Sequence, residues 1–292
     1  MMAKLFQKQE NTLIVNVIGG LCNRLLTIAT GIRLAKASHR HLCIVWANNK
    51  ELAADFCQLF EPLPAEINLR QPRNIEYNLI WEMPRKRNLY LSAVAQRLAF
   101  SEVYSDADRL IPFQGRHEEF INEIKSAEGR ILIISGYSIG GFDAETLRSV
   151  FRPSASVQEL IKAKTEKFSS HTTGVHIRRT DNIGSIKESP LHLFTAEIEK
   201  IIDEDHSANF FIASDDVNVT TELQRRFGSR IVCGDLNPSR TSLRGMMHGT
   251  ADLWAISMCS RILGSFQSSY SNTAAIIGDI PLKVCSISGK AW

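Results

Sequence analysis

Residues 13–46 read LIVNVIGGLCNRLLTIATGIRLAKASHRHLCIVW, and this stretch decides the fold class. Leu13–Ile18 and Leu42–Trp46 are short apolar runs of the kind that form buried strands. Between them, after the turn GGLCNR, apolar residues recur at helical spacing: Leu25, Ile28, Ala29, Ile32 and Ala35. A strand, a loop, a helix and a second strand in this order predict a parallel β-α-β unit.

The same alternation continues along the chain. Further strands are predicted at Ile131–Ser135, Gly174–Arg178, Asn209–Ala213, Ile231–Cys233, Ile262–Ser265 and Leu282–Cys285. Helices are predicted at Ala155–Phe168, Ala196–Glu204 and Val217–Phe227. The pattern restarts near Phe151, so we predict an α/β protein of two Rossmann-type parallel-sheet domains, residues 1–150 and 151–292. Ligands of such sheets collect at the carboxyl ends of the strands, which places the ligand cleft between the two domains.

The stretch from about Leu63 to Gly115 is rich in Pro, Arg and Asn, and its helical pattern is broken. We expect irregular structure there, in the form of a lid or an insertion that faces the acceptor.

Composition excludes several classes of protein. The 292 residues carry 34 basic and 31 acidic side chains, a net charge of +3, too small to indicate a nucleic-acid partner. No apolar run reaches the roughly 18 residues of a transmembrane helix, which leaves only peripheral membrane association open. The start lacks a secretion signal, and the six cysteines show no zinc-type spacing. We therefore expect reduced cysteines and a cytoplasmic protein.

The segment HIRRTDN, residues 176–182, places charged side chains at the end of a predicted strand. From there a guanidinium of Arg178 or Arg179 can hold a diphosphate through two hydrogen bonds. Asp181 can hold the second arginine in place, and His176 lies on the same strand. A surface cluster of ion pairs would show the same pattern.

Two further strand-to-helix turns offer groups for an anion. Gly19 and Gly20 let the backbone approach a ligand at a helix start, unless the segment is a tight turn with Asn23 as the helix cap. After the strand RILGS, the hydroxyls of SFQSSYS can donate to phosphate or ribose oxygens, with Ser268 and Ser269 at the turn. A serine-rich turn without a ligand fits that segment equally well.

Two acidic positions complete the candidate site. Asp252 lies among apolar residues of a predicted helix, and one carboxylate matches the N1–H and 2-amino donors of guanine; an exposed helix face is the alternative. Asp215 and Asp216 follow the strand FFIAS, where paired carboxylates could hold Mg²⁺, but their place before a helix favours a helix cap. We expect no metal site.

Taken together, the motifs resemble the fucosyltransferase superfamily that includes α1,6-fucosyltransferases, the nodulation-factor fucosyltransferase and protein O-fucosyltransferases. The resemblance rests on GGLCNRL, GVHIRRTDN, FFIASDD, SLRG and ADLWAISMCSRILGSFQSSYS, which occur in the family's order. The matching segments cover most of the C-terminal half, but only the first loop and helix of the N-terminal half.

This resemblance implies a GT-B fold and inverting fucosyl transfer from GDP-fucose to a sugar hydroxyl of a glycan acceptor, without a metal or other cofactor. Arg178 would bind the β-phosphate and Arg179 would orient the loop or the donor. Asp252 would read guanine, Ser268 or Ser269 would contact the phosphates, and the Gly19-Gly20 loop would close on the donor from the other domain.

One departure from the family bears on catalysis. The α1,6 enzymes follow their H-x-R-R-T-D motif with Lys and, four residues later, with Glu as the proposed base. Asn182 and Ile186 occupy these positions here, and Glu188 is the nearest carboxylate. Glu188 is therefore the candidate base. The alternatives are transfer from another GDP-sugar and a non-catalytic protein that binds a nucleotide sugar.

Overall fold

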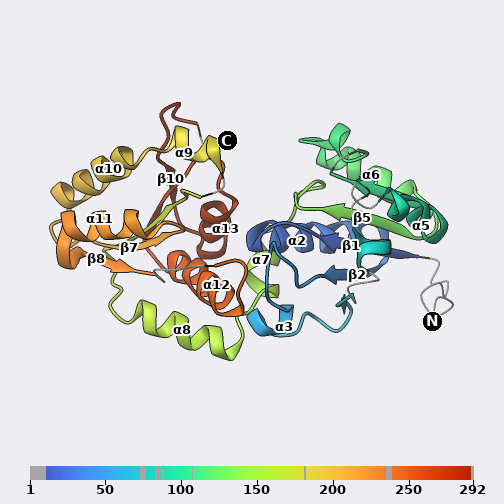
Figure 1. Ribbon diagram of the computed structural model, residues 1–292, viewed down its shortest axis with the longest axis horizontal. Coiled ribbons are helices and arrows are strands. Elements are labelled where there is room, and N and C mark those ends of the chain that lie inside the picture. The colour runs from blue at the N-terminus through green and yellow to red at the C-terminus, as the bar shows by residue number, and fades with distance from the viewer. Residues whose placement is uncertain are drawn as a thin grey trace. The chain divides into compact units, whose positions relative to one another are not determined.

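Two five-stranded parallel sheets organise the chain, with helices between successive strands (Figure 1). The structure, a computed structural model, describes residues 11–72, 77–82, 84, 86, 89–106, 108–180, 182–234 and 239–290. All pairings between the named strands in this part of the chain are parallel. The predicted class, an α/β GT-B-like protein with two Rossmann-type sheets, is confirmed.

The first sheet has the strand order β3-β2-β1-β5-β4. Its strands are β1 (Thr12–Val17), β2 (His41–Trp46), β3 (Asn68–Arg70), β4 (Glu102–Ser105) and β5 (Ile131–Ser135). The helical elements of this half are α2 (Leu21–Ser38), α3 (Phe56–Leu59), the π-helix η1 (Tyr77–Trp81), α5 (Leu91–Ala99), the 3-10 helix η3 (Ile111–Phe113), α6 (His117–Ser126) and α7 (Ala144–Val150). The central strands β1 and β5 are buried along their whole length, as expected for a parallel sheet covered on both faces.

The second sheet has the order β10-β9-β6-β7-β8. Its strands are β6 (Thr172–Ile177), β7 (Asn209–Ser214), β8 (Ile231–Cys233), β9 (Arg261–Gly264) and β10 (Leu282–Val284). The helices are α8 (Ala155–Thr165), α9 (Ile183–Glu188), α10 (Leu191–Glu204), α11 (Val217–Phe227), the 3-10 helix η4 (Gly228–Arg230), α12 (Leu243–Ser257) and α13 (Ser269–Gly278).

Alternation along β6 separates the two faces of this second sheet. Val175 and Ile177 pack with residues of α10 and α11 in one apolar cluster. On the other face, a Cβ at Gly174 would lie 3.0 Å from Ile256 of α12, and His176 stacks on Tyr270 of α13. The carboxyl end of β6 therefore lies between two layers of helices, at the centre of its sheet.

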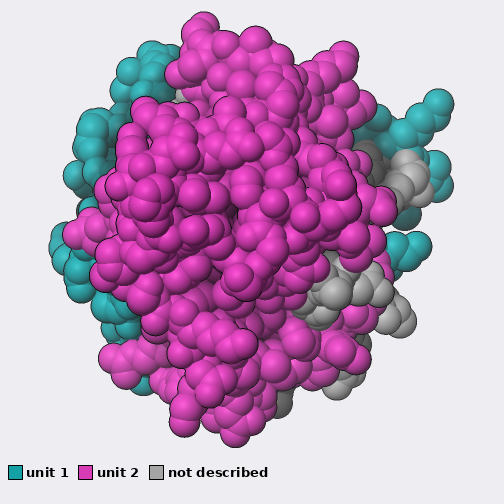
Figure 2. Space-filling model, turned by 90° about the vertical axis from the view of Figure 1, so that its left-hand side faces the viewer, with its two compact units in different colours: residues 1–56, 62–151 teal, residues 57–61, 152–292 magenta. Residues whose placement is uncertain are grey.

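The chain divides into two compact units, Met1–Phe56 with Pro62–Phe151 and Cys57–Glu61 with Arg152–Trp292 (Figure 2). The structure groups the segment Cys57–Glu61 with the second unit, which the predicted division at residue 150 does not include. That segment joins the second unit through backbone hydrogen bonds with Arg152 and Ser154, and through the ring of Phe60, whose centroid is 5.6 Å from that of Trp254.

The expectation of irregular structure from Leu63 to Gly115 is wrong in one important respect. This stretch supplies β3 and β4, the two edge strands of the first sheet, as well as helix α5. Asn68–Arg70 has one apolar residue and Glu102–Ser105 has two, so neither shows the continuous apolar run that indicates a buried strand. They form because β2 and β5 offer unpaired backbone groups to them.

Candidate functional site

Strand β6 ends at Ile177, so Arg178 and Arg179 both begin the loop that follows it. The backbone N–H of Arg178 donates to Ser265 Oγ at 3.0 Å, and the N–H of Arg179 donates to Asp215 Oδ1 at 2.6 Å. Ser265 follows β9 and Asp215 follows β7, the two strands that flank β6. The arginine loop is thus held from both sides at the carboxyl edge of the sheet.

The guanidinium of Arg179 donates hydrogen bonds to two backbone carbonyl oxygens. Its Nη1 donates to the carbonyl oxygen of Arg178 at 3.1 Å and its Nη2 to that of Ser189 at 2.7 Å. Burial lowers the pKa of Arg179, and the negative charges of Asp215 and Asp216 raise it by a smaller amount. Arg179 therefore orders the loop, and Arg178, half-buried like Arg179, stands at its start.

Asp215 is the carboxylate that fastens the loop. Besides the N–H of Arg179, it accepts the N–H of Thr180 at 3.3 Å and the Thr180 hydroxyl at 2.7 Å. Asp181, which is predicted from the sequence to hold the second arginine in place, lies outside the described residues. The signal for Asp215 was its place directly after the strand next to β6.

His176 is buried behind the arginines on the α13 face of β6. Its Nδ1 lies 2.9 Å from Ser271 Oγ and 3.2 Å from Ser268 Oγ, and its ring stacks on Tyr270 with centroids 4.5 Å apart. Burial, with the positive charge of Arg178, lowers the pKa of His176 to about 3. The imidazole is therefore neutral near pH 7 and positions the start of α13 rather than supplying charge.

The N-terminus of α13 adds backbone donors to the same edge of the sheet. Ser268 is its N-cap and accepts from the N–H of Ser271, while Ser269 is the first helical residue. A Cβ at Gly264 would lie 2.7 Å from Ser271 Cβ, so the glycine allows the close approach of β9 to the helix. The first amides of such a helix attract an anion.

The carboxylates of Asp215 and Asp216 accept hydrogen bonds from different segments of the chain. Asp216 is the N-cap of α11 and accepts the N–H of Asn218 at 2.9 Å, as the helix-cap interpretation predicts. Asp215 holds the arginine loop. In the part of the chain that the structure describes, no group of three or more His, Cys, Asp or Glu could hold a metal ion.

Asp252 of α12 is buried, so an exposed helix face is wrong for this position. Its carboxylate forms an ion pair with Lys164 of α8, with Nζ 2.8 Å from Oδ1. A Cβ at Gly234, next to the end of β8, would lie 2.7 Å from Asp252 Oδ2. The close approach of Gly234 places the carboxylate near the end of that strand, and the guanine-reading role of Asp252 stays a prediction.

The glycine-rich loop of the first unit is ordered by an arginine that sequence analysis did not single out. Arg24 is fully buried and donates to the carbonyl oxygens of Gly19 at 2.9 Å and Ala47 at 2.6 Å, and to Asn49 Oδ1 at 3.0 Å. Burial lowers the pKa of Arg24 to about 10, although Glu51 acts in the opposite direction.

The start of helix α2 differs from the cap that the sequence suggested. Gly19 has φ of +81°, and its N–H donates to the Glu51 carboxylate at 2.8 Å. Gly20 is the N-cap and the helix begins at Leu21, so the alternative in which Asn23 caps the helix is wrong. Binding of a donor by Gly19, Gly20 and Asn23 stays a prediction.

Solved structures of three fucosyltransferases share this arrangement of sheets. NodZ α1,6-fucosyltransferase soaked with GDP-fucose superimposes with a TM-score of 0.67 at 16% identity, over 97% of this chain and 98% of that chain. A variant of Arabidopsis thaliana FUT1 in complex with GDP gives 0.60 at 15% identity, over 96% and 72%. POFUT1 in complex with GDP gives 0.53 at 11% identity, over 95% and 99%.

This chain has the fucosyltransferase fold. The expected resemblance to that superfamily is thereby confirmed at the level of the fold. No family model and no curated protein matches the chain in sequence.

Within the fucosyltransferase fold, the candidate base Glu188 lies at the end of α9. Its carboxylate accepts the N–H of Ser288 at 3.2 Å, and its carbonyl oxygen accepts the N–H of Ile287 at 2.8 Å. Glu188 thus ties α9 to the turn after β10, and its role as a base stays a prediction.

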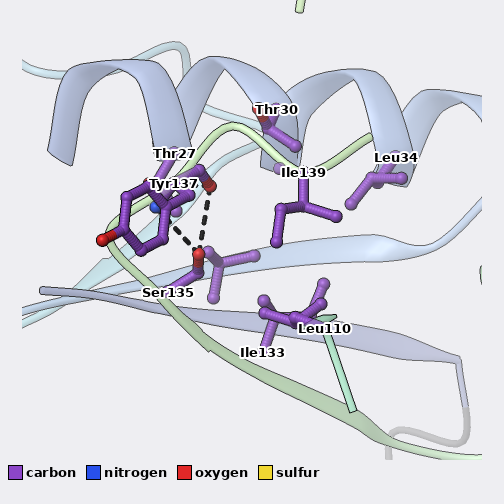
Figure 3. Close-up of a pocket in the computed structure, with 10 residues that line it drawn as sticks. Thr27, Thr30, Leu34, Leu110, Ile133, Ser135, Tyr137 and Ile139 are labelled. Carbon is purple, nitrogen blue, oxygen red and sulfur yellow. Dashed lines mark hydrogen bonds between the residues drawn. The ribbon is translucent and has the colours of Figure 1, made fainter. Parts of the chain in front are cut away.

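A cavity in the first unit of this fold is too small for a ligand. It lies between α2 and the sheet and is lined by Thr27, Thr30, Ile133 and Ser135, among others (Figure 3). Its volume of about 10 Å³ is at the lower limit for a single water molecule. Ser135 Oγ closes one side by accepting the N–H of Tyr137 at 2.9 Å.

Two general predictions concern the whole chain. None of the six cysteines, all of which lie among the described residues, forms a disulfide, and Cys57 is exposed. Among the described helices, none combines the length and the apolar composition that crossing a membrane requires.

Proposed function

We propose that this chain is a glycosyltransferase that transfers fucose from GDP-fucose to a sugar hydroxyl, with inversion and without a metal ion. One observation carries the proposal: two arginines stand at the carboxyl end of β6, with both of their backbone N–H groups fixed by side chains of the flanking loops. A preorganised cation at that edge suits the diphosphate of a nucleotide sugar.

The chemistry follows from charge. As the bond between C1 of the sugar and the β-phosphate oxygen breaks, its electron pair leaves with GDP, and negative charge grows on the diphosphate. Arg178 and the first amides of α13 stabilise that charge. The acceptor oxygen forms the new bond to C1 from the opposite face, and its proton passes to a base, for which Glu188 is the candidate.

The guanine base is the feature that would distinguish this donor from other nucleotide sugars. In the proposed complex, the Asp252 carboxylate accepts the N1–H and the 2-amino group of guanine. Lys164 then orients the carboxylate, because the two side chains form a buried ion pair in the protein itself. A uracil or adenine base does not present this pair of donors.

The donor is tested by thermal unfolding of the whole chain with GDP, GDP-fucose, GDP-mannose, UDP and ADP. A ligand at one hundred times its dissociation constant adds about 2.7 kcal/mol to the free energy of unfolding. GDP and GDP-fucose are expected to stabilise the protein, and UDP and ADP far less. Equal shifts for all nucleotides would remove the role of Asp252.

Metal independence is tested in a transfer assay with EDTA. The carboxylates of Asp215 and Asp216 hold backbone N–H groups, so activity should persist after chelation. Loss of activity with EDTA, restored by Mg²⁺ or Mn²⁺, would contradict this part of the proposal.

A second candidate function is binding of a nucleotide sugar without transfer. It is favoured by the contact of the Glu188 carboxylate with the Ser288 N–H, and by Ile186 at the position where related enzymes carry their proposed base. GDP-fucose that stabilises the protein but is neither hydrolysed nor transferred to any of a panel of glycans would support this reading over the enzyme.

A further inference from the structure

Helix α5 turns its apolar side chains outward and its polar ones inward. Leu91, Val94 and Leu98 are 56%, 60% and 80% exposed, whereas Ser92 and Gln96 are buried. An ordinary amphipathic helix of a globular protein has the opposite arrangement, with its apolar stripe against the core. The outward face of α5 therefore calls for an explanation.

Contacts on the inward face of α5 fix the orientation of the helix about its own axis. Gln96 Nε2 donates to the carbonyl oxygens of Ile80 at 2.9 Å and Glu82 at 3.1 Å, at the end of the π-helix η1. Ala95 and Ala99 pack against an apolar cluster that contains Trp81 and Phe100. Rotation would leave these buried carbonyls without the Gln96 amide, so the leucines are held outward by contacts on the opposite side.

The residues before the helix extend the same exposed surface. Leu89 and Tyr90 are 76% and 56% exposed, and both have φ in the left-handed region, at +50° and +55°. Two consecutive residues other than glycine are rare in this region. We call Leu89, Tyr90, Leu91, Val94 and Leu98 the α5 apolar face. Single exposed apolar residues are common, but five within ten positions are not.

Positive charge accompanies the α5 apolar face. Residues 83–100 contain Arg85, Lys86, Arg87 and Arg97 and no Asp or Glu, whereas the whole chain has a net charge of only +3. Lys86 and Arg97 are exposed, and Arg97 belongs to the outward side of the helix between Val94 and Leu98. Exposed apolar side chains with basic residues beside them are typical of helices that lie in a membrane interface.

We propose that the α5 apolar face binds the surface of an anionic lipid bilayer. Leu91, Val94 and Leu98 enter the boundary between headgroups and acyl chains, and Lys86 and Arg97 contact the lipid phosphates. Tyr90 suits the same depth, because its ring is apolar and its hydroxyl stays hydrated. A second copy of this chain is a poorer occupant, since a twofold interface would bring two equally positive faces together.

The binding is tested by cosedimentation of the full chain with vesicles. One set is pure phosphatidylcholine and the other contains about one third phosphatidylglycerol, as an anionic lipid. We expect the chain to sediment with the anionic vesicles at 0.1 M salt, and more weakly with neutral vesicles or at about 1 M salt, where charges are screened.

Two double variants separate the apolar and the electrostatic contributions. V94S/L98S should lower the partition coefficient by about tenfold or more, because it removes two inserted apolar side chains. K86Q/R97Q should lower it by about 25-fold, given that each basic residue near an anionic surface contributes about fivefold. Both variants alter exposed side chains, so the thermal unfolding midpoint should stay near that of the wild type.

The matched control is M258S, since Met258 is 58% exposed and lies in the second unit, outside the α5 apolar face. Its partition coefficient should equal that of the wild type. Three results would overturn the proposal: no sedimentation with anionic vesicles, equal loss of binding in M258S, or a concentration-dependent dimer that V94S/L98S dissociates in the absence of lipid. None of these depends on the donor or on transferase activity.

Discussion

Arginines lie near the carboxyl ends of β1 and β6, but the two sites use them in different ways. Arg24, after β1, is fully buried and donates to two carbonyl oxygens and one amide oxygen, with its guanidinium 4.9 Å from the Trp46 ring centre. After β6 there are two arginines, and they have different surroundings. Arg179 donates to the carbonyl oxygen of Arg178 in its own loop and to that of Ser189 at the end of α9, and Arg178 stands at the start of the loop.

The difference shows what an arginine needs in order to serve a ligand. A guanidinium that donates to backbone carbonyl oxygens is part of the loop's structure, and its removal should cost stability. A guanidinium at the end of a central strand, on a loop whose backbone other side chains hold, stands where ligands of such sheets bind, and its removal should cost function. Arg24 and Arg179 have the first kind of contacts, and for Arg178 we propose the second role.

The largest expected effect is on the stability of the first site. Arg24→Ala removes donors from the carbonyls of Gly19 and Ala47, so it should lower the free energy of unfolding by about 3 kcal/mol or more. Chemical denaturation followed by circular dichroism measures this. Arg116→Ala is the control, because Arg116 forms an exposed ion pair with Glu119 and should change stability by less than about 0.5 kcal/mol. Equal effects of the two would contradict the structural role of Arg24.

Arg178→Ala should instead affect catalysis. Its guanidinium is proposed to face charge that grows in the transition state, so kcat should fall about 100-fold or more, the effect of removing one preorganised donor. Arg178→Lys should recover little, because an ammonium cannot form the paired hydrogen bonds of a guanidinium.

Steady-state kinetics and GDP titration test Arg178, with thermal unfolding as the control for folding. Turnover of Arg178→Ala near the wild-type rate would place Arg178 with Arg24, as a structural residue, and the proposed donor site would be withdrawn.

Arg179→Ala should have a mixed effect, which makes it the sharpest test of the comparison. Loss of its bonds to the carbonyls of Arg178 and Ser189 should lower the free energy of unfolding by about 1–2 kcal/mol. As a positioning residue it should also weaken GDP binding, because Arg178 is then less well placed. If GDP affinity is unchanged while stability falls, Arg179 does not position Arg178.

The smallest effect at neutral pH is expected from His176, whose contribution appears only as a pH dependence in acid. Its pKa is about 3 in the folded protein and near 6.5 when unfolded, so the unfolded state binds more protons between these values. The contribution of this histidine is fully present above pH 6.5, and it is lost as pH falls toward 3, by at most about 1.4 kcal/mol per pH unit.

His176→Gln keeps a hydrogen-bonding group for Ser271 but removes the titration. Its free energy of unfolding should fall less steeply than that of the wild type below pH 6. Identical slopes for the two proteins would mean that His176 binds a proton as readily in the folded state as in the unfolded state.

Most of the strands and their parallel order could be predicted from the sequence, because a central strand of a parallel sheet is a continuous apolar run. The central strand Ile131–Ser135 and the edge strand Ile231–Cys233 are both apolar runs, and both were predicted with the bounds that the structure shows. The edge strands β3 and β4 could not be predicted in this way, since polar residues interrupt Asn68–Arg70 and Glu102–Ser105. Their pairing depends on β2 and β5, which lie elsewhere in the chain.

The candidate site was predictable in its residue types but not in its connections. Arg178 and Arg179 stand out because charge follows a strand. Their partners Ser265 and Asp215 are 87 and 36 positions away, and such pairs form only once the strands are ordered in the sheet. The same applies to Asp252, whose partner Lys164 lies on another helix.

The sequence by itself determined which segments become buried strands, where charged and hydroxyl side chains follow them, and that two such sheets occur in series. These are local properties, written in runs and spacings of a few residues. Only the tertiary structure decided which arginine is buried, which carboxylate fastens the arginine loop, and which side of α5 faces outward. Each depends on what lies across from the residue, and no local pattern records that a helix meets backbone carbonyls at Gln96 and solvent at Leu98.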